Sequence, residues 1–298
     1  MILSESWLRE WVNPDLDSDG LAHRLTMAGL EVDAVTALAE GLSGVIVAEI
    51  VAAQPHPDAD KLKVCSVNTG SDIVQIVCGA PNAEVGLKAP LAQPGDKLPG
   101  GVKIKKAKLR GVESQGMLCS AAELTLSEDH DGLLALASDA PIGTDISEYL
   151  NLDDRLIEIG LTPNRADCLS VLGVARDLAV VVDLPFNGEA SAPVEPKVDD
   201  TFPVTVLSPE KCPRYLGRVI RDVDVRRPTP LFMVERLRRS GIRSIDPVVD
   251  ITNYVMLEIG QPLHAFNLEA LEGGIVVREA QPNEALKLLD GQSREMTA

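Results

Sequence analysis

One imidazole and two carboxylates lie within five residues of one another, at His56, Asp58 and Asp60. Imidazole nitrogen and carboxylate oxygen are metal ligands, so this spacing is compatible with a cation site. Pro55 and Pro57 flank the histidine and fix a loop ahead of a strand. Because aspartates in such loops more often bond to the backbone in Asx turns, the sequence favours a turn over a metal site.

The basic residues of this acidic chain are concentrated in two segments. Lysine and arginine total 28 against 45 aspartates and glutamates, a formal net charge of -17. Residues 97–110 hold six basic residues and no acid, and residues 211–243 hold ten basic residues and three acids. This distribution excludes a generally basic protein that coats nucleic acid. It fits either a protein that meets a polyanion at chosen places or one with two solvated faces.

Five cations of the first segment are candidates for binding phosphates. Lys103 and Lys105 share one phase of an expected strand over residues 102–109, and Ile104 lies opposite. A β-bulge between residues 105 and 106 would keep all five charges on one face. The predicted RNA-binding residues are Lys103, Lys105, Lys106, Lys108 and Arg110.

Composition limits the remaining classes of protein. Hydrophobic residues make up 45% and charged residues 24%, as in globular proteins with well-filled cores. The five cysteines include no CxxC pair, which argues against a zinc site and against a disulfide framework. The first residues lack the apolar core of a signal peptide, and the longest apolar stretch is too short for a bilayer. We expect a cytoplasmic protein with no membrane partner.

The secondary structure expected to position these residues changes along the chain. Residues 1–38 predict two short helices and a strand. From residue 42 onward, short β-rich runs separated by Gly, Pro and Asp predict a small closed barrel. Its expected strands are residues 45–51, 62–68, 73–78, 88–91, 102–109 and 133–136.

Helical periodicity returns after Asn151. We expect a strand over 156–161, a turn at 162–165 and a helix over 168–182. This mixture of helix and strand resembles that expected for residues 1–38. We therefore interpret the barrel as an insertion in one small α+β domain. Residues 187–200 are rich in Pro, Ala, Ser and acid, which is typical of a linker.

A third unit is expected after the linker. It would hold strands over 202–207 and 215–223, helices over 228–240 and 251–258, and a strand pair over 274–278 and 285–288. Asp250 is the expected N-cap of the second helix. The pattern stops at Ala298 without a cap or tail, from which we expect a piece of a longer polypeptide.

Five ordered motifs between residues 40 and 150 resemble a known module. They are HPDADKL at 56–62, CGAPN at 78–82, the basic stretch, GVESQGMLCS at 111–120 and DGL at 131–133. Together they are similar to the tRNA-binding OB-fold shared by several aminoacyl-tRNA synthetases and their accessory proteins.

Further motifs extend the resemblance over nearly the whole chain. They are Trp7-Leu8, GLEV at 29–32, LTPNRAD at 161–167, GVARDLA at 173–179, DITNYVM at 250–256 and GQPLHAF at 260–266. These resemble the bacterial phenylalanine–tRNA ligase beta-subunit family. The resemblance implies an aminoacyl-tRNA ligase subunit that binds tRNA(Phe) and pairs with an alpha subunit in an alpha2-beta2 heterotetramer. It also implies that ATP and magnesium serve a synthetic site on the alpha subunit, so that this chain alone holds no cofactor or metal and is inactive.

The resemblance places a hydrolytic editing site at Asn253 and His264, with Thr252 and Tyr254 beside them. Taken alone, His264 would be a structural histidine, because no Ser or Cys nucleophile lies close in sequence. A phenylalanine pocket cannot strongly reject tyrosine, which only adds a hydroxyl, so a second site that hydrolyses Tyr-tRNA(Phe) has a physical purpose. An imidazole and an amide can bond to the attacking water and to the ester carbonyl. The candidate catalytic residues are His264, Asn253 and Thr252.

The predicted fold is α+β and multidomain. An N-terminal α+β domain over 1–39 and 151–186 would carry an inserted tRNA-binding OB-fold barrel over 40–150. A linker over 187–200 would lead to a truncated α/β editing domain over 201–298. The alternative function is a non-catalytic tRNA-binding module in which His264 is structural. A third interpretation is a scaffold protein whose barrel binds another protein.

Overall fold

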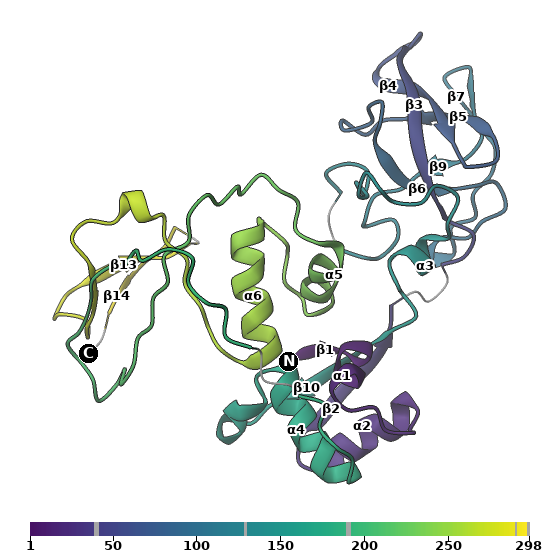
Figure 1. Cartoon of the computed structure of the whole chain (residues 1–298). Coiled ribbons are helices and arrows are strands. Elements are labelled where there is room, and N and C mark those ends of the chain that lie inside the picture. Colours follow the sequence, from purple (N-terminus) through teal and green to yellow (C-terminus); the bar gives the residue numbers. More distant parts are fainter. Residues whose placement is uncertain (39–41, 128–129, 189–191, 290, 297–298) are drawn as a thin grey trace. The chain divides into compact units, whose positions relative to one another are not determined.

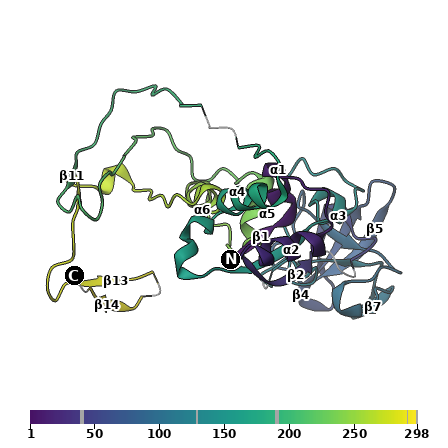
Figure 2. The same cartoon turned by 90° about the horizontal axis from the view of Figure 1, so that it is seen from below.

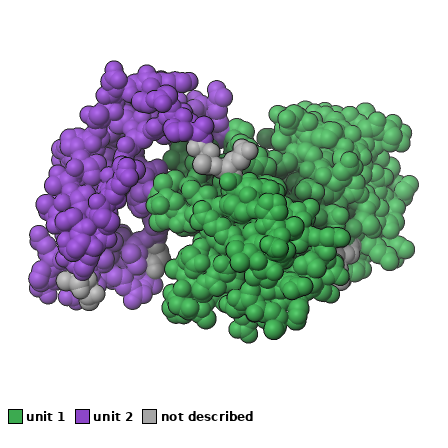
Figure 3. Space-filling model, turned by 60° about the horizontal axis from the view of Figure 1, so that its bottom comes forward, with its two compact units in different colours: residues 1–188, 228–263 green, residues 189–227, 264–298 purple. Residues whose placement is uncertain are grey.

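The structure is a computed structural model that describes residues 1–38, 42–127, 130–188, 192–289 and 291–296. The chain forms two compact units of mixed α/β structure (Figure 3). Unit 1 comprises residues 1–188 and 228–263, and unit 2 comprises residues 189–227 and 264–298. The division differs from the predicted boundary at residue 201, because the helical segment 228–263 groups with unit 1. The domain boundaries stay a prediction.

A three-stranded antiparallel sheet and three helices share one hydrophobic core in unit 1 (Figures 1 and 2). The sheet has the order β1-β10-β2, with β1 (Ile2–Ser4), β10 (Arg155–Gly160) and β2 (Glu31–Ala37). The helices are α1 (Glu5–Trp11), α2 (Ser18–Met27) and α4 (Val171–Val182), and the 3-10 helix η2 (Pro163–Cys168) precedes α4. Because β10 pairs with strands on both sides, segments far apart in sequence share one sheet and one core.

Side-chain caps explain where these helices begin. Ser4 accepts a hydrogen bond from the backbone N–H of Trp7, and Ser170 accepts one from Gly173. The cap of α2 is Asp17, which accepts a bond from the Gly20 N–H at 2.8 Å, and Ser18 is the first helical residue. Each cap satisfies a donor that the first helical turn leaves without a partner.

The segment between β2 and β10 forms a five-stranded antiparallel sheet of order β5-β4-β3-β6-β9. Its strands are β3 (Ile46–His56), β4 (Ala59–Asn68), β5 (Ile73–Cys78), β6 (Lys88–Ala92) and β9 (Met117–Leu118). The hairpin of β7 (Ala107–Leu109) and β8 (Val112–Ser114), the 3-10 helix η1 (Pro99–Gly101) and α3 (Ile146–Tyr149) complete the region. Among the described strands no ladder joins β9 to β5, so the predicted closed barrel is not confirmed.

Two predicted strands of this region are wrong. Over 102–109 only β7 is a strand, because Ile104 exchanges backbone bonds with Gly95 and Asp96 in place of a longer ladder. Over 133–136 there is no strand, since Leu134 and Leu136 donate to single carbonyls of Cys119 and Lys88. Each segment is therefore held by isolated backbone hydrogen bonds and by one buried side chain, Ile104 or Leu133.

The helical segment of unit 1 contains α5 (Leu231–Arg239) and α6 (Pro247–Ile259), which pack against each other. Asp250 is not the cap of α6. Asp246 is, because its carboxylate accepts bonds from the N–H groups of Val248 and Val249 at 2.9 and 3.1 Å. The following proline has no N–H to satisfy and suits the first helical position.

The described residues of unit 2 form two small sheets and one 3-10 helix. β11 (Val204–Val206) pairs in parallel with β12 (Ile275–Val277), and β13 (Ala285–Lys287) pairs with the antiparallel β14 (Ser293–Glu295). The 3-10 helix is η3 (Leu268–Ala270). The predicted pairing of 274–278 with 285–288 is therefore wrong, and residues 215–223 form no strand.

None of the helices described is both long and apolar enough to span a bilayer.

Candidate RNA interface and candidate editing residues

All five predicted RNA-binding cations are exposed. Lys103 forms an isolated β-bridge with Lys97. Lys105 and Lys106 lie in an irregular segment, and Lys108 lies on β7. Ile104, which is 6% exposed, packs into the core and fixes this segment to the sheet. Within the described part of the chain none of the five forms an ion pair, so their charges are available to an external anion.

Arg110 occupies an unfavourable backbone conformation at the tip of the β7–β8 hairpin. The two-residue turn joins Leu109 to Val112, and both of its residues are left-handed, with φ of 47° at Arg110 and 88° at Gly111. Such turns are most stable with Asn or Asp followed by Gly. The stability of the hairpin therefore does not explain why an arginine stands at this position. Its positive charge is the property that points to a role.

His56, the last residue of β3, holds a single tautomer. Its Nδ1 accepts a hydrogen bond from the Asp58 N–H at 3.1 Å, so Nε2 carries the proton and donates to the Leu109 carbonyl at 3.1 Å. The ring is 5% exposed. Because both nitrogens are engaged, the ring has no lone pair left for a metal.

The ligand atoms of Asp167, Cys168 and Asp177 all lie within 4.8 Å of one another, beside α4. The Arg165 guanidinium lies among them: it forms an ion pair with Asp177, donates to the Asp167 carboxylate at 3.3 Å and lies 2.9 Å from the Cys168 sulfur. The bond from Arg165 lowers the pKa of Asp167 below its usual value. This group is therefore an arginine–carboxylate cluster whose charge is already compensated.

Two of the three candidate editing residues lie on α6 in unit 1. The Thr252 hydroxyl donates to the Val249 carbonyl at 2.7 Å, which is a bond within the helix, and Asn253 is half-buried. Next to them the Tyr254 ring stacks on Trp7 with centroids 5.1 Å apart. The Tyr254 hydroxyl accepts from Arg236 and donates to Glu258, and burial raises the pKa of this phenol to about 12.

His264 belongs to unit 2, follows α6 by five residues and is exposed. Its ring lies against Phe266, with centroids 4.9 Å apart and planes inclined by 44°. The structure therefore does not enclose the three candidate residues in one compact unit.

Three arginines of α5 have structural partners. Arg236 pairs with Glu10 and lies over the Trp7 ring, while Arg238 pairs with Glu235 at 2.7 Å. Arg239 pairs with the buried carboxylate of Asp154 at 2.8 Å. The charges of these three arginines are thus compensated within the protein, whereas Arg243 is exposed.

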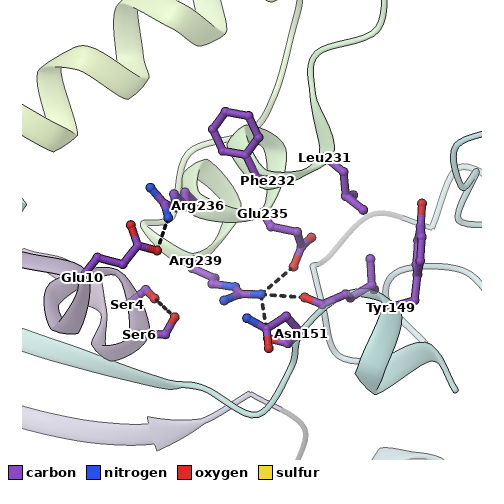
Figure 4. A pocket seen from close by; sticks show the side chains of 11 residues that line it. Ser4, Ser6, Glu10, Tyr149, Asn151, Leu231, Phe232, Glu235, Arg236 and Arg239 are labelled. Atoms are coloured by element: carbon purple, nitrogen blue, oxygen red, sulfur yellow. Dashed lines mark hydrogen bonds and ion pairs between the residues drawn. The ribbon is translucent and has the colours of Figure 1, made fainter. Parts of the chain in front are cut away.

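A cavity of about 220 Å³ lies beside these arginines in unit 1. Ser4, Ser6 and Glu10 border it from the start of the chain, and the turn after α3 contributes Asn151 (Figure 4). The close-up shows Arg239 reaching toward Glu235 and toward the backbone of the turn. Its charged side chains are paired with one another, so the cavity offers few free groups to a ligand.

Sequence analysis did not identify two aspartates as buried hydrogen-bond acceptors. Asp154 accepts from Ser4, from the Ser6 N–H and from Arg239, although no local pattern distinguishes it from Asp153. Asp250, which is 0% exposed, accepts from the Ile245 N–H and from the hydroxyls of Thr229 and Ser244. The Asp246-Pro247 pair was the available signal that α6 starts earlier and that Asp250 lies inside it.

Two family models match the regions just described. The putative tRNA binding domain matches residues 45–145, which include the five-stranded sheet and the five exposed cations. The B3/4 domain matches residues 211–298, which include Thr252, Asn253 and His264.

Curated relatives match the whole chain. The phenylalanine–tRNA ligase beta subunit of Pseudomonas putida is 61% identical over 298 residues, which is 100% of this chain and 38% of that protein. The chain belongs to the phenylalanine–tRNA ligase beta-subunit family. The beta subunit of Hahella chejuensis is 59% identical over 98% of this chain and 37% of its own length, and that of Yersinia pestis is 56% identical over 100% and 38%. The chain thus spans less than two fifths of these relatives.

Among solved structures, a MetRS related protein from Pyrococcus horikoshii is 28% identical and covers 34% of this chain and 87% of its own. The TM-score of 0.26 is too low to support a conclusion about the fold.

Proposed function

We propose that this chain supplies tRNA binding and hydrolytic editing to a phenylalanine–tRNA ligase. In this proposal residues 40–150 form an OB-fold that binds tRNA(Phe), and residues 201–298 are part of a domain that hydrolyses Tyr-tRNA(Phe). The whole enzyme would join phenylalanine to its tRNA in the cytoplasm, with an alpha subunit in an alpha2-beta2 assembly. ATP and magnesium would serve the synthetic step on the alpha subunit.

The proposal of tRNA binding rests on one observation: the segment that matches the tRNA-binding family model also holds the exposed cations. Residues 45–145 match that family model, and the same segment exposes Lys103, Lys105, Lys106, Lys108 and Arg110, which form no ion pair with any residue that the structure describes. A chain of net charge -17 repels RNA at long range, so binding has to depend on such a local surface.

The alternative, a non-catalytic tRNA-binding module, has one observation in its favour. His264 is exposed and packs against Phe266, and no hydrogen bond involving its ring is found among the described residues. A general base normally has a partner that orients it. Deacylation and binding assays separate the two proposals, because only the editor hydrolyses a mischarged tRNA.

Binding of tRNA(Phe) should weaken steeply as salt is raised. Two cations that each neutralise a phosphate give a slope of about -1.4 in a plot of log K against log salt, at roughly -0.7 per phosphate. The double variant Lys106→Glu/Lys108→Glu should flatten this slope and lower the affinity. The measurement is a titration of the 298-residue chain with a tRNA(Phe) transcript at several salt concentrations.

A matched control reverses two exposed cations outside both family matches, Arg24→Glu/Lys197→Glu. It changes the net charge by the same amount and should leave the slope unchanged, since a long-range effect is screened beyond about 10 Å at 0.1 M salt. Equal behaviour of the two double variants would show that residues 103–110 are only a solvated face.

A further inference from the structure

The HPDADKL motif has no role in the proposed function so far, yet its histidine contacts the cationic hairpin directly. His56 ends β3, and its Nε2 donates to the carbonyl of Leu109, which directly precedes Arg110. The bond therefore joins the tip of the β3–β4 hairpin to the tip of the β7–β8 hairpin (Figure 1).

The two strands of the β7–β8 hairpin are attached to the sheet very differently. On the β8 side, Ser114 is 2% exposed and its hydroxyl accepts from the Val77 N–H at 3.0 Å. The Gln75 side chain donates to the Glu113 carbonyl at 2.7 Å. On the β7 side, by contrast, Ala107, Lys108 and Leu109 are all exposed and bury no side chain in a core. Only β8 is thus fixed by packing as well as by hydrogen bonds.

The β7 side is held by its ladder to β8, by the buried Ile104 that precedes it and by the bond from His56. Within the part of the chain that the structure describes, no other hydrogen bond joins residues 105–111 to anything outside the hairpin. These residues include Lys106, Lys108 and Arg110. Besides the ladder to β8 and the buried Ile104, their position relative to the sheet therefore depends on this imidazole, which acts next to Arg110 at the tip of the hairpin.

The loop around His56 is suited to hold that imidazole in place. Pro55 and Pro57 restrict the backbone on both sides, and the Asp58 N–H occupies Nδ1. A bond at Nδ1 determines that the proton lies on Nε2, where it is needed to donate to the carbonyl. The ring itself is buried in a segment whose neighbours Pro55, Pro57 and Asp58 are largely exposed.

We propose that His56 is a positioning residue that fixes the β7–β8 hairpin so that Lys106, Lys108 and Arg110 can meet RNA phosphates together. This inference rests on the proposed tRNA binding and adds the residue on which its geometry depends. His56 itself does not contact RNA in this proposal. It acts through the Leu109 carbonyl.

Two amide substitutions at position 56 test the roles of the two ring nitrogens separately. Glutamine at position 56 can extend an N–H to where Nε2 lies and keep the bond to Leu109. Asparagine is shorter and can replace only the acceptor at Nδ1. Neither variant changes the net charge. His23→Asn, at an exposed position on α2, is the matched control.

The experiment compares these variants of the 298-residue chain by amide hydrogen exchange over residues 107–114 and by titration with a tRNA(Phe) transcript. His56→Asn should exchange faster in this hairpin while the rest of the sheet stays protected. Its affinity should fall roughly tenfold at low salt, and its salt slope should shrink by about 0.7 to 1.4, as expected for one or two lost phosphate contacts. His56→Gln should stay closer to wild type in both measurements.

Three results would overturn the proposal. The first is unchanged hairpin exchange in His56→Asn. The second is a fall in affinity with an unchanged salt slope, which indicates general destabilisation. The third is an equal loss in His56→Gln. A wild-type chain that fails to bind the transcript would instead refute the proposed function, and the exchange data would then show whether His56 is still the anchor of the hairpin.

Arg110→Asn tests the RNA side separately. Asparagine suits the left-handed turn better than arginine, so the hairpin should become more protected from exchange. The affinity for the transcript should nevertheless fall, because one cation is lost. A variant with a firmer hairpin and undiminished affinity would exclude Arg110 from the contact.

Discussion

Replacing Arg239 by methionine is expected to lower the free energy of unfolding by about 3–5 kcal/mol, as when one partner is removed from a buried ion pair. The Arg239 side chain is 5% exposed and that of Asp154 is 1% exposed. Besides this carboxylate, the guanidinium donates to the carbonyls of Leu150 and Asn151 at 2.8 and 3.0 Å. Methionine fills most of the volume but removes this donor from the buried Asp154 carboxylate and from the buried Leu150 carbonyl.

The measurement is urea denaturation of the 298-residue chain. Arg243→Met, at an exposed position of the same helical segment, is the control and should change stability by less than about 0.5 kcal/mol. The double variant Arg239→Met/Asp154→Asn should lose about 1–3 kcal/mol less than the sum of the single variants, because the two groups interact directly. A loss below about 1 kcal/mol in Arg239→Met would mean that the pair behaves like an exposed one.

This pair also explains why residues 228–263 group with unit 1. Arg239 comes from α5, Asp154 from the turn before β10, and Ser4 from the start of α1. Three segments far apart in sequence therefore meet at one carboxylate. Local patterning placed α5 after the linker in a separate domain, because a contact over 85 residues leaves no periodic signal in the sequence.

Regular periodicity made several elements predictable. Short β-rich runs between Gly, Pro and Asp predicted β3, β4, β5 and β6, and helical periodicity together with Pro or Asp at the expected starts predicted α4, α5 and α6. The parallel pairing of β11 with β12 was not predictable in this way, since it joins residues more than 60 positions apart. The strand over 102–109 failed for a different reason. Its alternating lysines imitate strand periodicity, whereas only Ile104 is buried there.

The candidate site was predictable only as residue types. The clustering of cations at 103–110 predicted an exposed basic surface, and the structure exposes all five. The bond from His56 to Leu109 could not be predicted, because it joins two loop tips 53 residues apart. The resemblance to a family identified Asn253 and His264, and their catalytic roles stay a prediction.

His264→Ala, introduced into a full-length beta subunit with this sequence and its alpha subunit, is expected to slow hydrolysis of Tyr-tRNA(Phe) about a hundredfold or more. That is the usual loss when one positioned hydrogen bond to a reacting group is removed. Asn253→Ala should act in the same direction. Charging with phenylalanine should stay close to wild type, because the proposed synthetic site lies on the other subunit. The measurement is deacylation of preformed Tyr-tRNA(Phe) beside aminoacylation with phenylalanine.

The 298-residue chain alone should leave Tyr-tRNA(Phe) intact. His264 is exposed here, and water around an unenclosed imidazole weakens the hydrogen bonds that would activate one water and polarise one ester. His23→Ala is the histidine control in the full enzyme and should change neither reaction. If His264→Ala lowered charging and left deacylation unaltered, the editing role would be wrong. His264 would then be a structural residue whose partner is Phe266, and the non-catalytic tRNA-binding module would be the better description.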